Sequence, residues 1–201
     1  RVLAATETGS VVYAVPGSAA VGERAVAQIR ERAARSGVSV TVHPGLSFLD
    51  LVYVAVGVDP ITDGLQVLDA RDLPDPLPLH VPTIITQVDS ALRAADVSLA
   101  LTRTIDPDTE VTILDRLGDD DEAVVVVTAS ELARHPAGPR TTVYVPRTLS
   151  GFLGLIETNR ILRRECPWDQ KQTHHTLLTH LMEEAYETAD AIGRLSEAAP
   201  E

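Results

Sequence analysis

The sequence is poor in cysteine, in aromatic residues and in long apolar runs. Its 201 residues contain a single cysteine, Cys166, which excludes an intramolecular disulfide and suits a reducing compartment. Seven aromatic residues cannot fill a core, so we expect a core of aliphatic side chains. The longest apolar stretch, residues 48–58, is interrupted by Asp50 and is shorter than the roughly 18 residues that a membrane span needs. We therefore expect a cytoplasmic protein with no membrane partner.

Positive charge is also scarce. Seventeen Lys and Arg residues stand against 29 Asp and Glu residues, which gives a formal net charge of −12. An acidic surface repels phosphate backbones, so we expect no nucleic-acid partner. An acidic chain can still bind nucleotides, because a divalent cation can bridge carboxylates and phosphates. The hydrophobic fraction of 44% and the charged fraction of 23% are typical of a globular protein and argue against wholesale disorder.

Strand and helix patterns alternate at the beginning of the chain. Residues 11–15 and 38–42 are apolar or β-branched runs that predict strands, and residues 20–35 between them have a helical pattern. Residues 46–56 could form a helix or a strand, and their position after a loop favours a helix. This order is typical of a parallel sheet with crossover helices.

Further strand patterns and one clear helix, at residues 90–101, predict a second α/β lobe. The predicted strands are residues 65–69, 83–86, 110–114, 123–127 and 141–145. The sequence Gly-Asp-Asp-Asp at residues 118–121 predicts a turn between two of these strands. We therefore expect some antiparallel pairing in this lobe, and a two-lobed α/β domain over residues 1–146.

Strand patterns stop after Pro146, and residues 147–201 predict the first helices of an all-α domain. Helical spacing covers residues 148–164 and 173–192. The second helix carries an acidic stripe opposite its apolar face, and residues 172–193 contain no Lys or Arg to relieve the repulsion. A divalent cation would supply the missing positive charge. An ordinary solvated helix face is the simpler alternative.

Two segments of this region carry a family resemblance. Residues 165–174 (ECPWDQKQTH) and 181–187 (LMEEAYE) closely resemble the opening of the MazG family of nucleoside triphosphate pyrophosphohydrolases. The resemblance implies a helical-bundle enzyme, usually oligomeric, that uses Mg²⁺ to cleave a nucleoside triphosphate into a monophosphate and pyrophosphate. That family completes its metal site with an ExxD motif on the next helix. This sequence contains no such motif after the second helix, so we expect an incomplete bundle.

The MazG resemblance also implies residue roles. Glu184 and Glu187 would be Mg²⁺ ligands, and Glu183 would be a further ligand or a catalytic base that positions water. Trp168 would lie near the substrate nucleotide, and so would Lys171 as a second catalytic residue.

Two Pro-Gly loops each follow a predicted strand and precede a helix. They are Pro16-Gly17-Ser18 and Pro44-Gly45-Leu46-Ser47. In open α/β sheets, ligands bind beyond the carboxyl ends of strands, where glycine lets the backbone approach the ligand closely. Any turn from a strand into a helix can also carry Pro-Gly, so the dipeptides alone leave both interpretations open.

The flanks of these loops carry a second resemblance. Residues 12–24 (VYAVPGSAAVGER) and 42–50 (VHPGLSFLD) resemble the later part of the tetrapyrrole methylase family, and the likeness extends loosely over residues 11–145. These are two-lobed methyltransferases that bind S-adenosylmethionine between their lobes. The family's first strand, with its glycine-rich loop, would precede Arg1. The cofactor-binding residues implied here are Pro16, Gly17, Ser18, Pro44, Gly45 and Ser47.

Together the patterns predict an incomplete fusion protein. Residues 1–146 would be a methylase-like domain without its first strand, and residues 147–201 would begin a MazG domain. The main function expected is pyrophosphohydrolysis of nucleoside triphosphates with Mg²⁺, in a protein that is a homo-oligomer at full length, although this chain alone would be inactive. One alternative is methyl transfer from S-adenosylmethionine. The other is a non-catalytic module that binds a small molecule.

Overall fold

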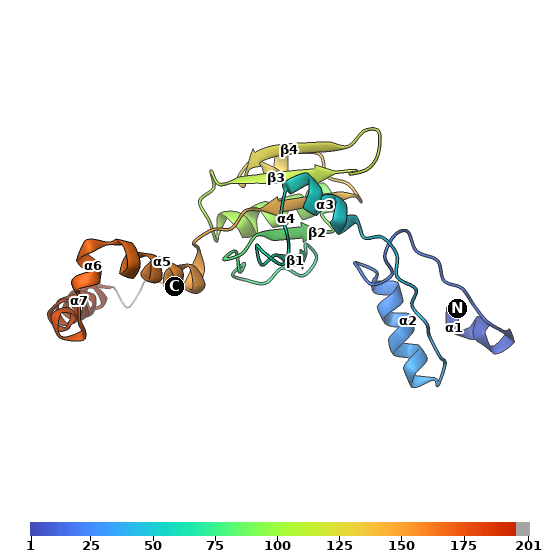
Figure 1. The fold of residues 1–201 in the computed structure, drawn as a ribbon, viewed down its shortest axis with the longest axis horizontal. Helices are drawn as coiled ribbons and strands as arrows, with labels where there is room; N and C mark the ends of the chain where they lie inside the picture. The colour runs from blue at the N-terminus through green and yellow to red at the C-terminus, as the bar shows by residue number, and fades with distance from the viewer. Residues whose placement is uncertain (196–201) are drawn as a thin grey trace. The chain divides into compact units, whose positions relative to one another are not determined.

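The chain divides into two compact units, Arg1–Gly151 and Phe152–Glu201. A computed structural model describes residues 1–195 (Figure 1). The predicted boundary between domains, after Pro146, falls just before this division, and the assignment of a domain type to the second unit stays a prediction. None of the helices in the described residues combines the length and the apolar composition that a membrane crossing requires.

A mixed sheet of five strands forms the centre of the first unit (Figure 1). Its order is β1-β2-β5-β3-β4, with β1 and β2 parallel and the other pairs antiparallel. The strands are β1 (Gln66–Asp69), β2 (Thr83–Thr86), β3 (Glu110–Asp115), β4 (Ala123–Thr128) and β5 (Thr141–Val145). All five were predicted from the sequence, and β2 to β5 are rich in Val, Ile and Thr, which favour a pleated surface. The α/β class and the antiparallel pairing are therefore confirmed.

Helices cover both faces of this sheet. On one face lies α4 (Ala91–Thr102), which begins where the Ser90 hydroxyl accepts a hydrogen bond from the Arg93 N–H group. Its buried side chains pack with Ile85 in the larger apolar cluster. On the other face lies α3 (Phe48–Val56), whose Val52 is buried. The sequence of residues 46–56 was compatible with a helix or a strand and favoured a helix. That prediction is confirmed.

The segments before α3 differ from the prediction. Helices α1 (Val2–Ala5), η1 (Thr6–Thr8) and α2 (Arg24–Arg35) are present, but residues 11–15 and 38–42 belong to no strand of the described chain. The side chain of Val12 is 92% exposed. A strand needs a neighbour for its N–H and C=O groups, and residues 1–195 pair neither run. The predicted parallel sheet in this lobe is therefore wrong for the described residues.

The second unit is helical, as predicted. It consists of α5 (Gly151–Glu165), α6 (Pro167–Lys171) and α7 (His174–Arg194). Proline occupies the first position of α6, where its missing N–H group costs no hydrogen bond. Thr173 caps α7, because its hydroxyl accepts from the Thr176 N–H group at 3.2 Å. In the described part of these helices only Gly154 is buried, so they form no closed bundle by themselves.

Candidate functional site

The two Pro-Gly loops lie against each other. A Cβ atom built on Gly45 would lie 2.5 Å from the carbonyl oxygen of Gly17. Gly17 has a left-handed backbone with φ of 77°, and a Cβ there would lie 3.1 Å from the carbonyl oxygen of Leu46. Two motifs far apart in the sequence are therefore brought together, and their contact leaves no room for a side chain at residue 45.

The serines of both loops stabilise local structure. Ser47 caps α3, since its hydroxyl accepts from the Leu49 N–H group at 3.2 Å, and the Asp50 carboxylate accepts from the backbone N–H group of Ser47 at 3.3 Å. The Ser18 hydroxyl accepts from the N–H group of Ala20 at 3.3 Å. Pro16 and Pro44 restrict the backbone that leads into each glycine. What the loops offer a ligand is mainly their backbone N–H and C=O groups.

Gln87 lies at the carboxyl end of β2, beside the segment that follows the first loop. Its φ of 62° is rare for a residue with a side chain. A Cβ atom on Gly22 would lie 3.1 Å from the amide nitrogen of the Gln87 side chain. Residues with a strained backbone of this kind occur more often at functional sites than elsewhere. Sequence reasoning gave Gln87 no role, because nothing in the residue type signals a left-handed backbone.

An ion pair occupies the carboxyl end of β1. The Arg71 Nε and Nη2 atoms donate to the two carboxylate oxygens of Asp69 at 2.9 and 3.0 Å. Nη2 of Arg24, on α2, lies 3.9 Å from the same carboxylate. The hydrogen bonds from Arg71, helped by both positive charges, hold the pKa of Asp69 below its usual value despite partial burial. Asp69 therefore stays charged, and its carboxylate lies near the guanidinium of Arg24 on α2.

Asp69→Asn should make folding less sensitive to acid. Because the pKa of Asp69 is lowered in the folded chain, its charge stabilises the fold above the unfolded pKa of about 3.9. That contribution is lost as the pH falls through the lower folded pKa. The pair is partly exposed, so we expect the variant to lose about 0.5–1 kcal/mol at pH 7. Urea unfolding should show this difference shrinking at pH 3, and a difference that does not change with pH would contradict the assignment.

The residues predicted for nucleotide chemistry lie on α6 and α7. Glu183, Glu184 and Glu187 are exposed on α7, and Oε2 of Glu183 lies 3.5 Å from Nδ1 of His180. Within residues 1–195 no three His, Cys, Asp or Glu side chains are placed to hold a metal ion. Mg²⁺ requires near-octahedral oxygen ligands. The carboxylates that the structure describes therefore do not by themselves fit this ion.

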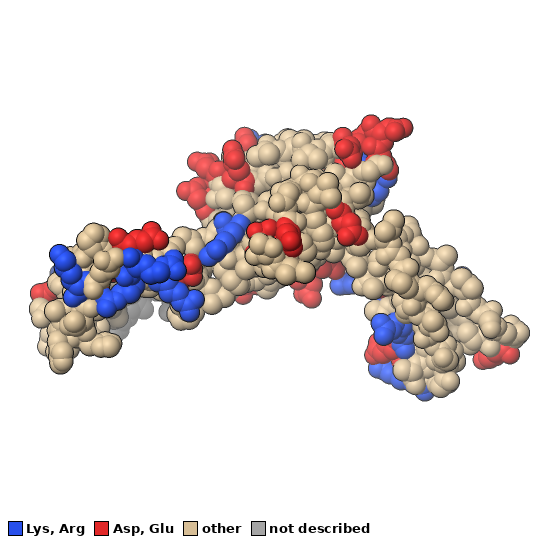
Figure 2. Space-filling view, viewed as in Figure 1, with Lys and Arg blue, Asp and Glu red and all other residues tan. Residues whose placement is uncertain are grey.

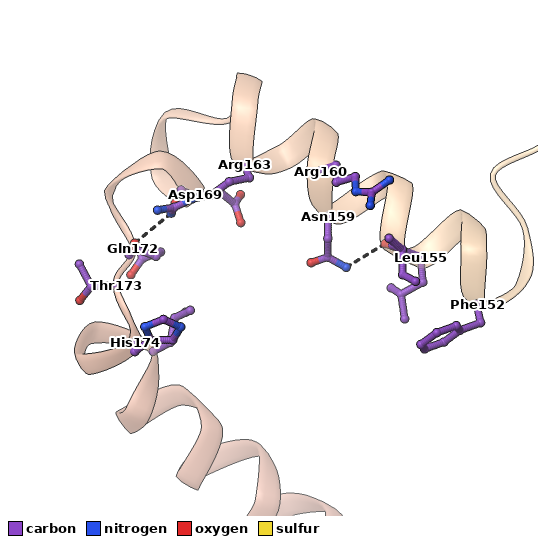
Figure 3. Close-up of a pocket in the computed structure, with 11 residues that line it drawn as sticks. Phe152, Leu155, Asn159, Arg160, Arg163, Asp169, Gln172, Thr173 and His174 are labelled. Carbon is purple, nitrogen blue, oxygen red and sulfur yellow. Dashed lines mark hydrogen bonds between the residues drawn. The ribbon is translucent and has the colours of Figure 1, made fainter.

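The other two predicted residues also fail to meet in one cavity. Trp168 packs against α7, with its ring centroid 6.0 Å from that of His180. Lys171 ends α6 and is exposed. A cavity of about 970 Å³ lies between α5 and α7 (Figure 3), but neither residue lines it, nor do the three glutamates. The structure therefore does not assemble a nucleotide site from the predicted residues.

Comparison with known proteins identifies the first unit. The model of the family described as Tetrapyrrole (Corrin/Porphyrin) Methylases matches residues 1–133. The chain belongs to the tetrapyrrole methylase family. It is also 39% identical over 192 residues to the uncharacterized protein YabN of Bacillus subtilis strain 168. This match covers 90% of the chain but only 39% of YabN, so the chain spans well under half of that relative.

Solved structures share the fold of this tetrapyrrole methylase family member at low identity. A putative diphthine synthase from Entamoeba histolytica is 16% identical with a TM-score of 0.57, over 79% of this chain and 73% of that one. The native uroporphyrin III C-methyltransferase from Thermus thermophilus is 18% identical with a TM-score of 0.53, over 77% and 69%. These likenesses show the fold alone. None of these matches supports the predicted pyrophosphohydrolase activity.

Proposed function

We propose that this member of the tetrapyrrole methylase family binds S-adenosylmethionine and serves methyl transfer. The observation that carries the proposal is the contact of Gly17 with Gly45 in a chain of this family. The second loop leads directly into α3, which packs on the sheet, and Gly22, after the first loop, lies against the side chain of Gln87 at the carboxyl end of β2. Asp69 stands at the carboxyl end of the parallel neighbour β1. In α/β folds this is the edge where ligands bind.

The residues at this edge fit such a cofactor. S-adenosylmethionine carries an amino-acid group, ribose hydroxyls and an adenine ring, which bind through hydrogen bonds. The glycine loops would offer backbone N–H and C=O groups, Gln87 an amide, and Asp69 a charged carboxylate. When bound, the cofactor supplies a methyl group on a positively charged sulfur. The chain contributes alignment, because methyl transfer needs little acid–base catalysis.

Equilibrium dialysis with radiolabelled S-adenosylmethionine tests this function. We expect saturable binding by the chain, and transfer of the label to an acceptor once the acceptor is found. Binding without transfer to any of a panel of acceptors would favour the non-catalytic module instead. If the folded chain bound neither the cofactor nor its demethylated product, both the methyltransferase and the non-catalytic module that binds this cofactor would be contradicted.

A second candidate function rests on the acidic helix α7. We propose that the helical unit, together with further helices, hydrolyses nucleoside triphosphates to pyrophosphate, as its resemblance to the MazG family implies. Three neighbouring glutamates are exposed on α7 without Lys or Arg between them.

The chain by itself should release no pyrophosphate from nucleoside triphosphates with Mg²⁺. The carboxylates of one exposed helix provide only part of a metal shell. A coupled pyrophosphate assay with each common nucleoside triphosphate checks this result. The exposed variant Glu165→Ala is the matched control. If the wild-type chain and Glu165→Ala both released pyrophosphate and Glu184→Ala did not, the prediction would be wrong, because the metal site would then be complete within these residues.

A further inference from the structure

Strand β4 lies at one edge of the sheet, and no other strand of the described residues pairs with its outer side (Figure 1). Its register with β3 is continuous from Ala123 to Thr128, without a bulge. Natural proteins usually protect such an edge with a charged side chain, a proline or a bulge. Residues 123–128 (AVVVVT) contain no proline and no charged residue. The edge is therefore open to a further strand.

The pairing of β4 with β3 identifies the backbone groups that face outward. Directly after the last paired residues, the Ala129 N–H group donates to the carbonyl oxygen of Thr109 at 2.9 Å. In an antiparallel pair, positions with and without hydrogen bonds to the neighbouring strand alternate. Counted back from Ala129, every second residue bonds to β3, whereas Val124 and Val126 direct their N–H and C=O groups outward. Each of these two valines therefore offers a partner strand one donor and one acceptor.

The side chains along this edge are apolar and exposed. Val124 is 49% exposed and Val126 is 59% exposed, and both lie on the same face of the sheet because side chains alternate along a strand. Val125, on the other face, is 37% exposed. An added strand would bury these valines and would also bond to the outward backbone groups. Both contributions are typical of peptides that bind by extending a sheet.

Acidic residues flank β4 at both ends. Figure 2 shows Asp and Glu side chains at each end of this strand, with uncharged residues between them. The turn before β4 and the segments beside its carboxyl end contain Asp119, Asp120, Asp121 and Glu122, and Asp106, Asp108, Glu110 and Glu131, respectively. A partner with positive charge at both ends of its extended segment would complement this arrangement.

Ion pairs within the chain neutralise only part of this acidic charge. Among the described residues, Asp108, Glu110 and Asp120 form no ion pair. The carboxylates that are paired with arginine are Asp119 with Arg140, Asp121 with Arg116, and Glu131 with Arg134. Each end of β4 therefore keeps a net negative charge, which favours a basic partner over an acidic one.

We propose that β4 is a docking edge for an extended segment of a partner protein, which adds a strand to the sheet. The segment would carry apolar side chains that cover Val124 and Val126, and basic residues at both ends. Main-chain hydrogen bonds would supply affinity, and the charges would select the partner. Strand β1 lies at the opposite edge of the sheet, so this interaction is separate from the proposed cofactor site and does not depend on methyl transfer.

Fluorescence anisotropy with labelled synthetic peptides tests the docking edge. The probe Lys-Lys-Thr-Val-Thr-Val-Thr-Lys-Lys has basic residues at both ends, so it can pair with β4 in either direction. We expect saturable binding with a Kd on the order of 100 μM or lower. The same peptide with glutamate in place of every lysine should bind about tenfold more weakly or worse. No binding of the lysine peptide at about 1 mM, or equal binding of the two peptides, would overturn the proposal.

Val126→Pro should weaken binding of the lysine peptide about tenfold or more, because it removes an outward N–H donor. The bonds to β3 remain, since proline is tolerated on an edge strand where its nitrogen faces away from the neighbour. Val67→Pro is the matched control on the other edge strand, β1, because Val67 is 42% exposed. The N–H groups of Gln66 and Ala70 donate to β2 and its flank, so by alternation that of Val67 faces outward. Peptide binding that Val126→Pro leaves unchanged, or that both variants weaken equally while folded, would contradict strand addition at β4.

The charge at the two ends has a separate test. Asp108→Lys with Asp120→Lys should weaken the lysine peptide and strengthen the glutamate peptide. Asp72→Lys with Asp75→Lys makes the same charge change in the loop after β1 and should alter neither affinity as much. Equal effects of the two double variants would show that net charge, and not the ends of β4, selects the peptide.

Hydrogen exchange reports whether the edge is open before the peptide is added. The Val124 and Val126 amides should exchange rapidly in the free chain and slowly with the lysine peptide bound. Slow exchange without the peptide would show that the chain itself or a second copy covers β4, and would overturn the proposal.

Discussion

Gly45→Ala should lower the affinity of the chain for S-adenosylmethionine by about tenfold or more. The added Cβ would lie 2.5 Å from the carbonyl oxygen of Gly17, closer than real Cβ atoms approach an oxygen. The two loops must therefore separate, and the backbone groups that they present move with them. Gly45 is not among the glycines with positive φ, so alanine tests the loop contact without adding backbone strain. Isothermal titration calorimetry provides the measurement.

Gly138→Ala is the matched control for this substitution. A Cβ atom there meets nothing within 4 Å, and Gly138 also lacks a positive φ. It should bind the cofactor as the wild type does. If Gly45→Ala also kept the wild-type affinity while remaining folded, the contact between the loops would be no part of the cofactor site.

Leu114→Ala should cost about 2–5 kcal/mol of the free energy of unfolding, the range for a buried leucine that leaves a cavity. Leu114 is fully buried on β3 and forms one apolar cluster with Val52 of α3 and Ile84 of β2. This cluster holds α3 on the sheet, and α3 begins directly after the second Pro-Gly loop. The variant should therefore weaken cofactor binding as well as stability.

Urea unfolding with a matched control checks the cost of Leu114→Ala. Val126 lies on the adjacent strand β4 and is 59% exposed, so Val126→Ala should cost less than about 1 kcal/mol. Equal losses for the two variants would show that α3 is not held by this cluster.

Strands were predictable where the described residues provide a paired neighbour. The β-branched runs that became β2 and β5 pair with neighbours and are nearly all buried. Residues 11–15 and 38–42 have the same composition but form no strand in the described chain. β-branched residues favour an extended backbone. Whether such a run becomes a strand also depends on a neighbouring strand, which the run's own sequence does not determine.

The candidate site was predictable only in part. Both loops were predicted from their Pro-Gly dipeptides, because the conformational freedom of glycine is a property of the residue itself and can be inferred from the sequence. The contact between Gly17 and Gly45 and the pairing of Asp69 with Arg71 depend on the folded chain. The left-handed backbone of Gln87 likewise follows from its place after β2.

The order of preference between pyrophosphohydrolysis and methyl transfer differs from the one that the sequence favoured. The sequence favoured pyrophosphohydrolysis, because the motif in residues 165–187 is long and specific. The structure places its glutamates on one exposed helix, whereas the family match covers residues 1–133. Methyl transfer is therefore the better supported function.

Hydrogen exchange with and without S-adenosylhomocysteine tests the cofactor site most directly, because it locates binding along the chain. The demethylated cofactor should slow exchange at the loops around Gly17 and Gly45 and at Gln87, while β4 and the helices α5–α7 keep their rates. Protection that lies only outside these three segments, or none at saturating ligand, would contradict the account.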